Sequence, residues 1–213
     1  MPVLLSHGII GSRSSAGPAL VSLGALVLTG SPAFGQPTTA GDFLVAWTAV
    51  NYTYATTCSD PTWSRITYAD PTGFGADMWY KANCGGSETA PTFNSTNASM
   101  LAEFSGVAAL VASGTTGTSN PNSASISLSN ASTDPAAPAL VVAGAMGVGG
   151  ITLPVTVSMT DGSGGVITSH PTYGNPAPVF AWAITGAAGA AADAVTFTWS
   201  TAGFPCAVIA SAR

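Results

Sequence analysis

Short apolar or alternating segments follow one another along the chain, separated by clusters of Gly, Pro, Asn, Asp and Ser. Helical periodicity is nearly absent, and this combination is typical of an all-β sandwich or barrel. The sequence DGSGG predicts a hairpin between residues 153–160 and 165–170, because its glycines supply the positive φ of a tight turn. The whole pattern predicts strands at residues 19–29, 42–52, 62–69, 76–83, 92–95, 99–107, 123–129, 139–148, 153–160, 165–170, 178–185, 194–200 and 205–211.

Segments of similar sequence recur in the same order in the two halves of the chain. We interpret them as a pseudo-repeat of two four-stranded halves, about 17–111 and 123–213, joined by a polar linker at 112–123. The alternative is a chance likeness between strands rich in Ala, Val and Thr. Because one half alone would expose its apolar face, we expect both to pack into one jelly-roll β-sandwich domain over residues 17–213. The paired segments are LVAW (44–47) with LVVA (140–143), MWYKA (78–82) with FAWAI (180–184), TFNST (92–96) with TFTWST (196–201), and MLAEF (100–104) with AVIAS (207–211).

The segment GDFLVAWTAV, residues 41–50, is apolar along almost its whole length. Such a run predicts a strand buried on both sides, by the facing sheet on one side and by an arm or a neighbour on the other. Large or sulfur-containing residues in this and other strands are predicted to fill the core: Trp47, Trp79, Trp182, Trp199 and Cys206.

The N-terminal residues lie outside the repeat. We expect residues 1–16 to form an arm that rests on its own domain or on a neighbouring subunit, and residues 17–29 to form a strand. The alternative for this region is a secretory signal, because an apolar run after an arginine ends in the small-x-small sequence Ala33-Phe34-Gly35. No apolar run reaches the length of about 18 residues that a membrane span needs, so none is expected.

Charged residues make up only 6% of the chain, against about a quarter in an ordinary globular protein. The bases are scattered along the sequence, at Arg13, Arg65, Lys81 and Arg213. Nucleic-acid binding needs a clustered basic surface, so nucleic acid is not an expected partner. The low charge suits a secreted protein, or a subunit whose surface is largely covered by its neighbours.

No recognisable motif for catalysis, metal binding or cofactor binding occurs in the sequence, and we expect neither enzyme activity nor a cofactor. Glu103 lies in the apolar sequence MLAEFSG. It is either a general acid or a strand residue that pairs with Arg65 or Lys81, or points outward.

The acidic residues Asp60, Asp70 and Asp77 lie close together in sequence, and they indicate either a calcium site or ordinary turns. Two of the three cysteines, Cys58 and Cys84, lie in polar, loop-like surroundings. We predict a disulfide between them, which would imply an oxidising environment, whereas the alternative is three free thiols.

Several aromatic residues near predicted loops are candidates for stacking on a sugar ligand: Tyr52, Tyr54, Trp63 and Tyr173. The alternative is that they fill the ends of the sandwich.

Five short motifs follow one another in the first half of the chain. They are Gly41-Asp42, Pro61-Thr62-Trp63, Trp79-Tyr80-Lys81, Ser87-Glu88 with Pro91-Thr92-Phe93, and Glu103-Phe104-Ser105-Gly106. Together they resemble a jelly-roll module of tail and other virion proteins of tailed bacteriophages, which also occurs in some bacterial surface proteins. The resemblance covers residues 38–108 well and the second half loosely. Cys58 and Cys84 depart from the pattern.

The resemblance implies no catalytic residues. It implies a non-enzymatic structural protein of an extracellular virion, either a tail-associated (minor tail) subunit or one that decorates the capsid. The expected partners are other virion proteins and copies of the chain itself, as a homo-oligomer. The alternative is a carbohydrate- or receptor-binding module on a virion or cell surface, with a cell-surface glycan as its partner. A third possibility is a secreted hydrolase.

Overall fold

The computed structural model describes residues 17–27, 31–51, 56–69, 74–94, 96, 98–117, 123–129, 139–148, 155–160, 166–169, 177–184 and 194–213. Every regular element in these ranges is a β-strand, which confirms the all-β prediction. No helix in the described ranges is long and apolar enough to cross a membrane. The predicted arm at residues 1–16 lies outside the described residues.

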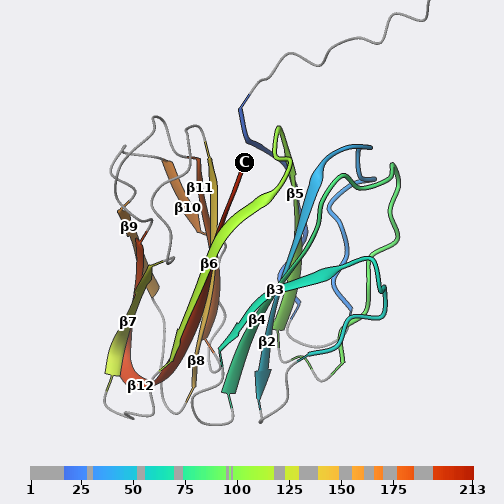
Figure 1. The fold of residues 1–213 in the computed structure, drawn as a ribbon. Helices are drawn as coiled ribbons and strands as arrows, with labels where there is room; N and C mark the ends of the chain where they lie inside the picture. Colours follow the sequence, from blue (N-terminus) through green and yellow to red (C-terminus); the bar gives the residue numbers. More distant parts are fainter. Residues whose placement is uncertain are drawn as a thin grey trace, which may run out of the picture.

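The strands form two antiparallel sheets that face each other (Figure 1). The first sheet has the order β1 (Ala19–Leu23), β5 (Ala98–Ser105), β2 (Phe43–Asn51), β4 (Phe74–Lys81) and β3 (Ser64–Ala69). The main path of the second sheet has the order β10 (Val166–Ser169), β11 (Ala177–Ile184), β8 (Leu140–Val148), β12 (Ala194–Ala212) and β6 (Leu110–Gly117). Each half of the chain therefore supplies one sheet.

Two further strands, β7 (Ser123–Ser129) and β9 (Val155–Thr160), pair with the first part of β12. The long strand β12 changes partners along its length. Its residues 194–199 pair with β7 and β9, and its residues 204–212 pair with β8 and β6. The first part of β12 thus belongs to a small three-stranded sheet, which we call the cover sheet.

Three hydrophobic clusters lie between the layers of the fold. The largest fills the space between the two main sheets and contains Trp47, Met78, Phe104 and Phe180. A second cluster lies between the second sheet and the cover sheet, and it includes Phe197 of β12. A third lies on the outer face of the first sheet, beneath loops. The central strands of both main sheets are therefore buried on both faces.

Strand β2 shows this double burial most clearly. Residues 43–49 are all buried, as the apolar segment predicted. Trp47 belongs to the cluster between the sheets, whereas Leu44 belongs to the cluster on the outer face. The outer cover consists of the protein's own loops, in place of the expected arm or neighbour. The predicted core residues Trp79, Trp182, Trp199 and Cys206 are buried as well.

Trp47 packs against a glycine of the opposite sheet. A Cβ atom at Gly144 of β8 would lie 2.1 Å from both Cδ1 and Nε1 of the indole. Real Cβ atoms do not approach other heavy atoms this closely, so the ring occupies the space that any side chain at position 144 would need. Gly144 sits in the middle of β8, opposite Val208 of β12 and Phe180 of β11.

The two main sheets have the same strand order. Read from β6, the second sheet runs β6-β12-β8-β11-β10. Without β7 and β9, the strands of the second half follow one another along the chain as β6, β8, β10, β11 and β12. Their order in the sheet is therefore first, fifth, second, fourth and third. The first sheet, β1-β5-β2-β4-β3, follows the same rule. Each repeated unit is thus five-stranded, in place of the four strands expected from the sequence.

The equivalent edge strands β1 and β6 share a local irregularity. In β1 the register shifts between Leu20, opposite Phe104, and Ser22, opposite Glu103. In β6 it shifts between Leu110, opposite Ala212, and Ala112, opposite Ser211. The shift falls after the sequence Ala-Leu in both strands, at Val21 and at Val111. Bulges at sheet edges hinder pairing with further chains, so both edges carry the same protection.

The sequence similarity between the halves is partly out of register with this equivalence. Phe43, Val45 and Trp47 face the space between the sheets, and so do Leu140 and Val142 of β8. Alignment of LVAW with LVVA places Leu44, which faces outward, on Leu140, which faces inward. A shift of one residue moves a strand's side chains to the opposite face of the sheet. The sequence alignment therefore pairs the correct strands but places them one residue out of register.

Four expectations about the strands are wrong. The predicted linker at 112–123 contains most of β6, which pairs with β12. The expected hairpin does not form in the described pairings, because β10 pairs with β11 and β9 pairs with β12. Of the strand predicted at 92–95, the described residues 92–94 form only an isolated bridge, between Phe93 and Cys58. The two predicted C-terminal strands are one continuous strand of 19 residues.

Candidate functional site

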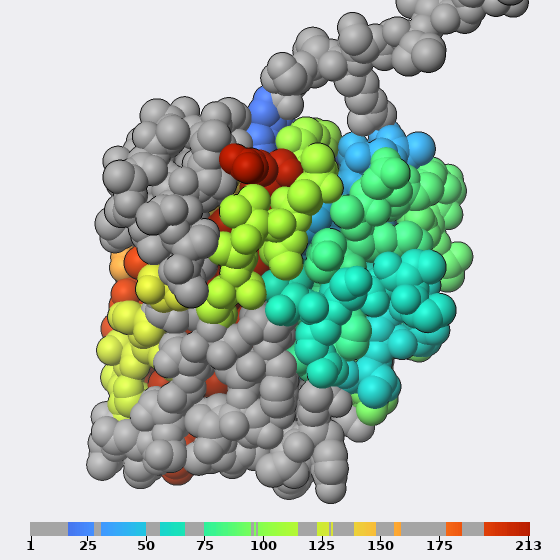
Figure 2. Space-filling model, viewed as in Figure 1, coloured from blue at the N-terminus to red at the C-terminus, as the bar shows by residue number. Residues whose placement is uncertain are grey.

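The motifs of the first half come together in a layer of loops on the outer face of the first sheet. Residues 56–63 lead into β3, and residues 82–94 follow β4. These two loops lie side by side on one face of the molecule, in teal and green in Figure 2, and backbone hydrogen bonds join them. Beneath them, Leu44, Trp63, Trp79 and Phe93 form the outer hydrophobic cluster. We call this region the loop layer.

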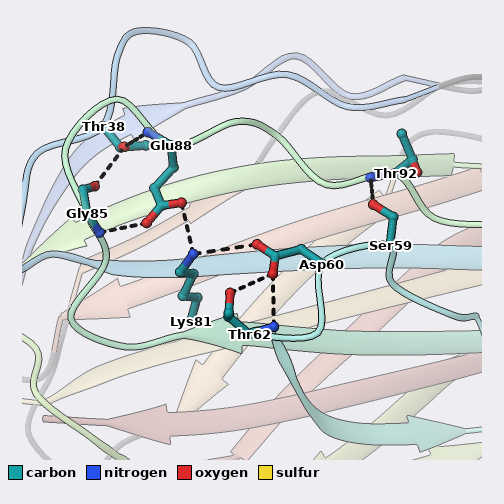
Figure 3. Close-up of polar contacts among 8 residues, drawn as sticks. All are labelled: Thr38, Ser59, Asp60, Thr62, Lys81, Gly85, Glu88 and Thr92. Carbon is teal, nitrogen blue, oxygen red and sulfur yellow. Dashed lines mark hydrogen bonds and ion pairs between the residues drawn. The ribbon is translucent and has the colours of Figure 1, made fainter.

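Lys81 ties the two loops together at the end of β4 (Figure 3). Its Nζ lies 2.8 Å from Oε2 of Glu88 and 3.5 Å from Oδ2 of Asp60. Burial alone would lower the pKa of Lys81, but its hydrogen bond to Glu88 and the charges of Glu88 and Asp60 together raise it. Lys81 therefore stays positively charged and holds one carboxylate from each loop.

Further hydrogen bonds fix both carboxylates. The backbone N–H of Gly85 donates to Oε1 of Glu88 at 2.6 Å, and the backbone N–H of Glu88 donates to Oγ1 of Thr38 at 2.7 Å. Asp60 accepts from both the N–H and the Oγ1 of Thr62, at 2.9 and 2.7 Å. These bonds from Thr62, with the charge of Lys81, lower the pKa of Asp60.

The loops are also joined directly to each other. The backbone N–H of Ser59 donates to the carbonyl of Thr92 at 2.9 Å, and the N–H of Thr92 donates to Oγ of Ser59 at 2.9 Å. Figure 3 shows this pair on the far side of Asp60 from Glu88.

A second polar group lies deeper, around Asp77 of β4. Its Oδ2 accepts hydrogen bonds from the backbone N–H and the Oγ1 of Thr56, both at 2.6 Å. The Nε of Arg65 lies 3.3 Å from Oδ1 of Asp77, and the Arg65 guanidinium stacks 4.6 Å from the centre of the Trp79 ring. The Trp79 indole donates to Oγ1 of Thr56 at 3.0 Å. These contacts fix the start of the loop before β3.

Glu103 is fully buried, yet its partners are neither of the two bases that the sequence suggested. Its Oε1 accepts the backbone N–H of Thr39 at 2.6 Å, and its Oε2 accepts the Oγ of Ser22 at 3.2 Å. It therefore fastens the segment before β2 and strand β1 onto β5. These contacts give Glu103 a positioning role.

The glycines of the motifs serve tight turns in the same layer. Gly41 has a φ of 89° and Gly106 a φ of 70°, values that residues with a side chain rarely adopt. Backbone bonds from Gly41 to the Cys84 carbonyl and from Cys84 to the Asp42 carbonyl close the turn before β2. All five short motifs of the first half thus contribute to holding loops on a sheet.

The predicted disulfide between Cys58 and Cys84 is not formed, and both residues are free cysteines. They lie in different surroundings. Cys58 sits at the bridge to Phe93, whereas the Cys84 thiol donates to the carbonyl of Thr39 at 3.1 Å. Burial raises the pKa of both thiols, which keeps them in the less reactive protonated form.

We expect alkylation of the unfolded protein, without a reductant, to label all three cysteines of each chain, as counted by intact mass. Labelling of the folded protein should be much slower, because the thiols are protonated and largely buried. The matched control is the same experiment after reduction. A count that rises on reduction would show a disulfide and contradict the arrangement described above.

The aromatic candidates for ligand stacking have different outcomes. Trp63 is only 5% exposed and packs in the outer hydrophobic cluster, so its prediction as a stacking surface is wrong. A turn at residues 61–62 precedes Trp63, and the backbone N–H of Trp63 donates to the carbonyl of Asp60 at 3.2 Å. Tyr52, Tyr54 and Tyr173 lie outside the described residues. Asp70 of the possible calcium site also lies outside them, and Asp60 and Asp77 have the separate partners given above.

Comparison of the chain with protein-family models, with curated proteins and with solved structures finds no match.

Two surface features were not foreseen from the sequence. One is a pocket beside Glu88, formed by the segment around Phe34 and the loop after β4. The other is the outer face of the cover sheet, where the residues that point outward are mainly Ser and Thr. The alternation of Ser with apolar residues in SASISLS, residues 123–129, was the available signal for the second feature. No sequence signal indicates that Phe34 and Glu88 line the same pocket, because they lie more than fifty residues apart in the chain.

Proposed function

We propose that this chain is a non-enzymatic structural subunit of a bacteriophage virion, either associated with the tail or decorating the capsid. It assembles with other virion proteins and with copies of itself. The observation that carries the proposal is the outer face of the cover sheet, where the exposed side chains of the described residues are Ser and Thr and none is charged. A face without charge suits burial against a neighbouring subunit.

The cover sheet supplies a candidate surface for such contacts. Its inward residues, such as Ile126, Val195 and Phe197, are buried. Its outward residues form cross-strand rows of hydroxyl groups, Ser125–Thr198–Thr156 and Ser127–Thr196–Ser158. In Figure 2 the yellow strand β7 lies at the surface of the molecule.

Such a face is compatible with a copy of itself. Each Ser or Thr hydroxyl both donates and accepts a hydrogen bond, so a face of hydroxyl groups is complementary to an identical face. The chain has a net charge of −5, which disfavours the approach of two copies. Contact through the cover sheet keeps the acidic loop layers of both copies apart, because these lie on the opposite side of the sandwich.

The motifs of the loop layer support the same proposal. Their residues hold loops on a sheet, which is the role expected of a module that serves as a building block. The jelly-roll assignment belongs to this proposal as well, and the two facing antiparallel sheets support it at the level of architecture.

Introduction of positive charge on the cover sheet tests the proposal. We expect the double variant Ser127→Lys/Thr198→Lys to fold but to be absent from purified virus particles, in which the unchanged chain is detected by mass spectrometry. Two buried lysines in a contact between subunits would each cost several kcal/mol, about enough to abolish assembly. The matched control is Ser64→Lys, which places a lysine on an exposed position of the first sheet.

Sedimentation of the purified protein provides the second measurement. We expect the unchanged chain to self-associate as its concentration rises, and the double variant to remain monomeric. A chain that stays monomeric at all concentrations and is found in no virus particle would contradict the proposal. Equal incorporation of the double variant and the control would contradict the choice of surface.

A further inference from the structure

A pocket of about 410 Å³ opens beside the Lys81 contacts on the loop layer. Its walls come from two segments far apart in sequence: Phe34, Gln36 and Pro37 before β2, and Ser87, Glu88 and Ala90 after β4. The pocket is shallow and widely open to solvent, so it suits a small ligand held at the surface. The outer hydrophobic cluster lies beneath it and supports Phe34.

The polar wall of the pocket is rigid. Glu88 is held by Gly85 at one oxygen, by Lys81 at the other, and by Thr38 at its backbone N–H. A carboxylate has about four acceptor positions, so each oxygen of Glu88 keeps one for a ligand. An acceptor that is already fixed in place loses little conformational entropy when it binds a hydroxyl group.

The other wall is apolar, with one flexible polar group. Phe34 is half-buried, and Pro37 and Gln36 are exposed. Phe34 and Pro37 present flat apolar surfaces, and the Gln36 amide provides both a donor and an acceptor. An apolar surface that lines the same pocket as fixed acceptors is complementary to a ring with one C–H face and several hydroxyl groups.

The backbone at the pocket is strained. Ser87 has a φ of 58°, which is uncommon for a residue other than glycine, and its N–H donates to the carbonyl of Thr38 at 2.9 Å. Such conformations persist where the surrounding structure enforces them, and they are frequent at ligand sites. At this position the strain places Glu88 directly after the turn and against the pocket.

We propose that this pocket binds a neutral sugar, with Phe34 and Pro37 against the ring face, Glu88 accepting from two ring hydroxyl groups, and Gln36 contacting a third. The local charge determines the class of sugar. Two carboxylates, Asp60 and Glu88, surround one base, Lys81, so an acidic sugar would be repelled. The site is independent of the proposed assembly surface, which lies on the opposite side of the sandwich.

Titration of the isotope-labelled full-length chain with free sugars tests this inference. The neutral ligands are methyl glucoside, methyl galactoside, methyl mannoside and N-acetylglucosamine, and glucuronic acid is the acidic comparison. We expect at least one neutral sugar to shift the backbone amide signals of residues 85–90 with a dissociation constant of about 1–10 mM, given the size of the ligand. Glucuronic acid should bind at least about tenfold more weakly.

Two variants assign the effect to the pocket. Gln36→Ala removes an exposed side chain and should weaken binding about threefold to tenfold. Phe34→Ala should abolish detectable binding, and its folding is checked from the amide spectrum because Phe34 also contacts the outer cluster. The matched control is Ser125→Ala on the cover sheet, which should bind as the unchanged chain does.

Absence of shifts at residues 85–90 with all four neutral sugars, up to about 50 mM, would overturn the inference. Equal binding by the unchanged chain and Gln36→Ala, or stronger binding of glucuronic acid, would also overturn it. None of these three results would bear on assembly, which the cover-sheet variants measure separately.

Discussion

Replacement of Gly144 with alanine is expected to lower the free energy of unfolding by about 1–3 kcal/mol, and by more if the strand cannot move. The new Cβ would lie 2.1 Å from two atoms of the Trp47 indole, in the middle of the core between the sheets. The ring has no free space to move into, because Trp47 is fully buried and β8 is paired on both sides. Urea denaturation followed by tryptophan fluorescence measures the loss.

A double variant isolates the contact. Trp47→Leu is destabilising by itself, but it removes the ring that meets the new methyl group. The loss in Gly144→Ala/Trp47→Leu should therefore be smaller than the sum of the two single losses, by about 1 kcal/mol. Gly86→Ala is the matched control, because its Cβ would have no neighbour closer than 3.8 Å and should change stability by less than about 0.5 kcal/mol. Additive losses in the double variant would show that the contact is not the cause.

The contact between Trp47 and Gly144 illustrates what the sequence could and could not reveal. The apolar run around Trp47 predicts a strand buried on both faces, and the structure confirms it. The partner of the indole depends on how two sheets are placed against each other, and no local pattern encodes that placement. A glycine in a strand indicates only that some group approaches closely.

The wrong predictions about β6 and β12 arise because the local sequence does not show which strands pair. Residues 112–117 have few apolar side chains, because β6 is an edge strand, and such a composition resembles a linker. Gly203 and Pro205 resemble a break between two strands, yet β12 continues through both. In these cases pairing with neighbouring strands outweighs the local preference.

The two halves share a strand order but differ in what covers their outer faces. Loops fixed by Lys81, Asp77 and Glu103 cover the first sheet, and a cover sheet without charged residues covers the second. The five short motifs of the first half all belong to the first kind of cover. Among the described residues, the charged side chains of Lys81, Asp77 and Glu103 thus serve mainly to hold loops on the first sheet.

Replacement of Asp77 with alanine is expected to cost about 2–3 kcal/mol of unfolding free energy. Asp77 is fully buried, and its loss would leave the N–H and hydroxyl of Thr56 without their acceptor. The Arg65 side chain is about one-third exposed, so water would partly replace its ion pair, and the cost stays below that of a fully buried pair. Chemical denaturation at neutral pH measures the change.

The pH dependence of stability tests the contacts of Asp77 and Asp60, because the pKa values of these two carboxylates shift in opposite directions. Burial raises the pKa of Asp77 above 3.8 and outweighs the opposing effects of Thr56 and Arg65. As pH rises from about 3.8 through that raised pKa, the folded chain retains a proton that the unfolded chain has released, so stability falls. The stability of the unchanged chain relative to Asp77→Asn should therefore decline with rising pH across this window.

Asp60 gives the matched comparison, because hydrogen bonds from Thr62 and the charge of Lys81 lower its pKa below 3.8. Its contribution is present above 3.8 and is lost as pH falls through the lowered pKa. The stability of the unchanged chain relative to Asp60→Asn should therefore decline as the solution becomes more acidic. Desolvation governs the pKa of the buried Asp77, whereas hydrogen bonds govern the pKa of the partly exposed Asp60. If both stability differences changed with pH in the same direction, the contacts described above would not be the cause of the two pKa shifts.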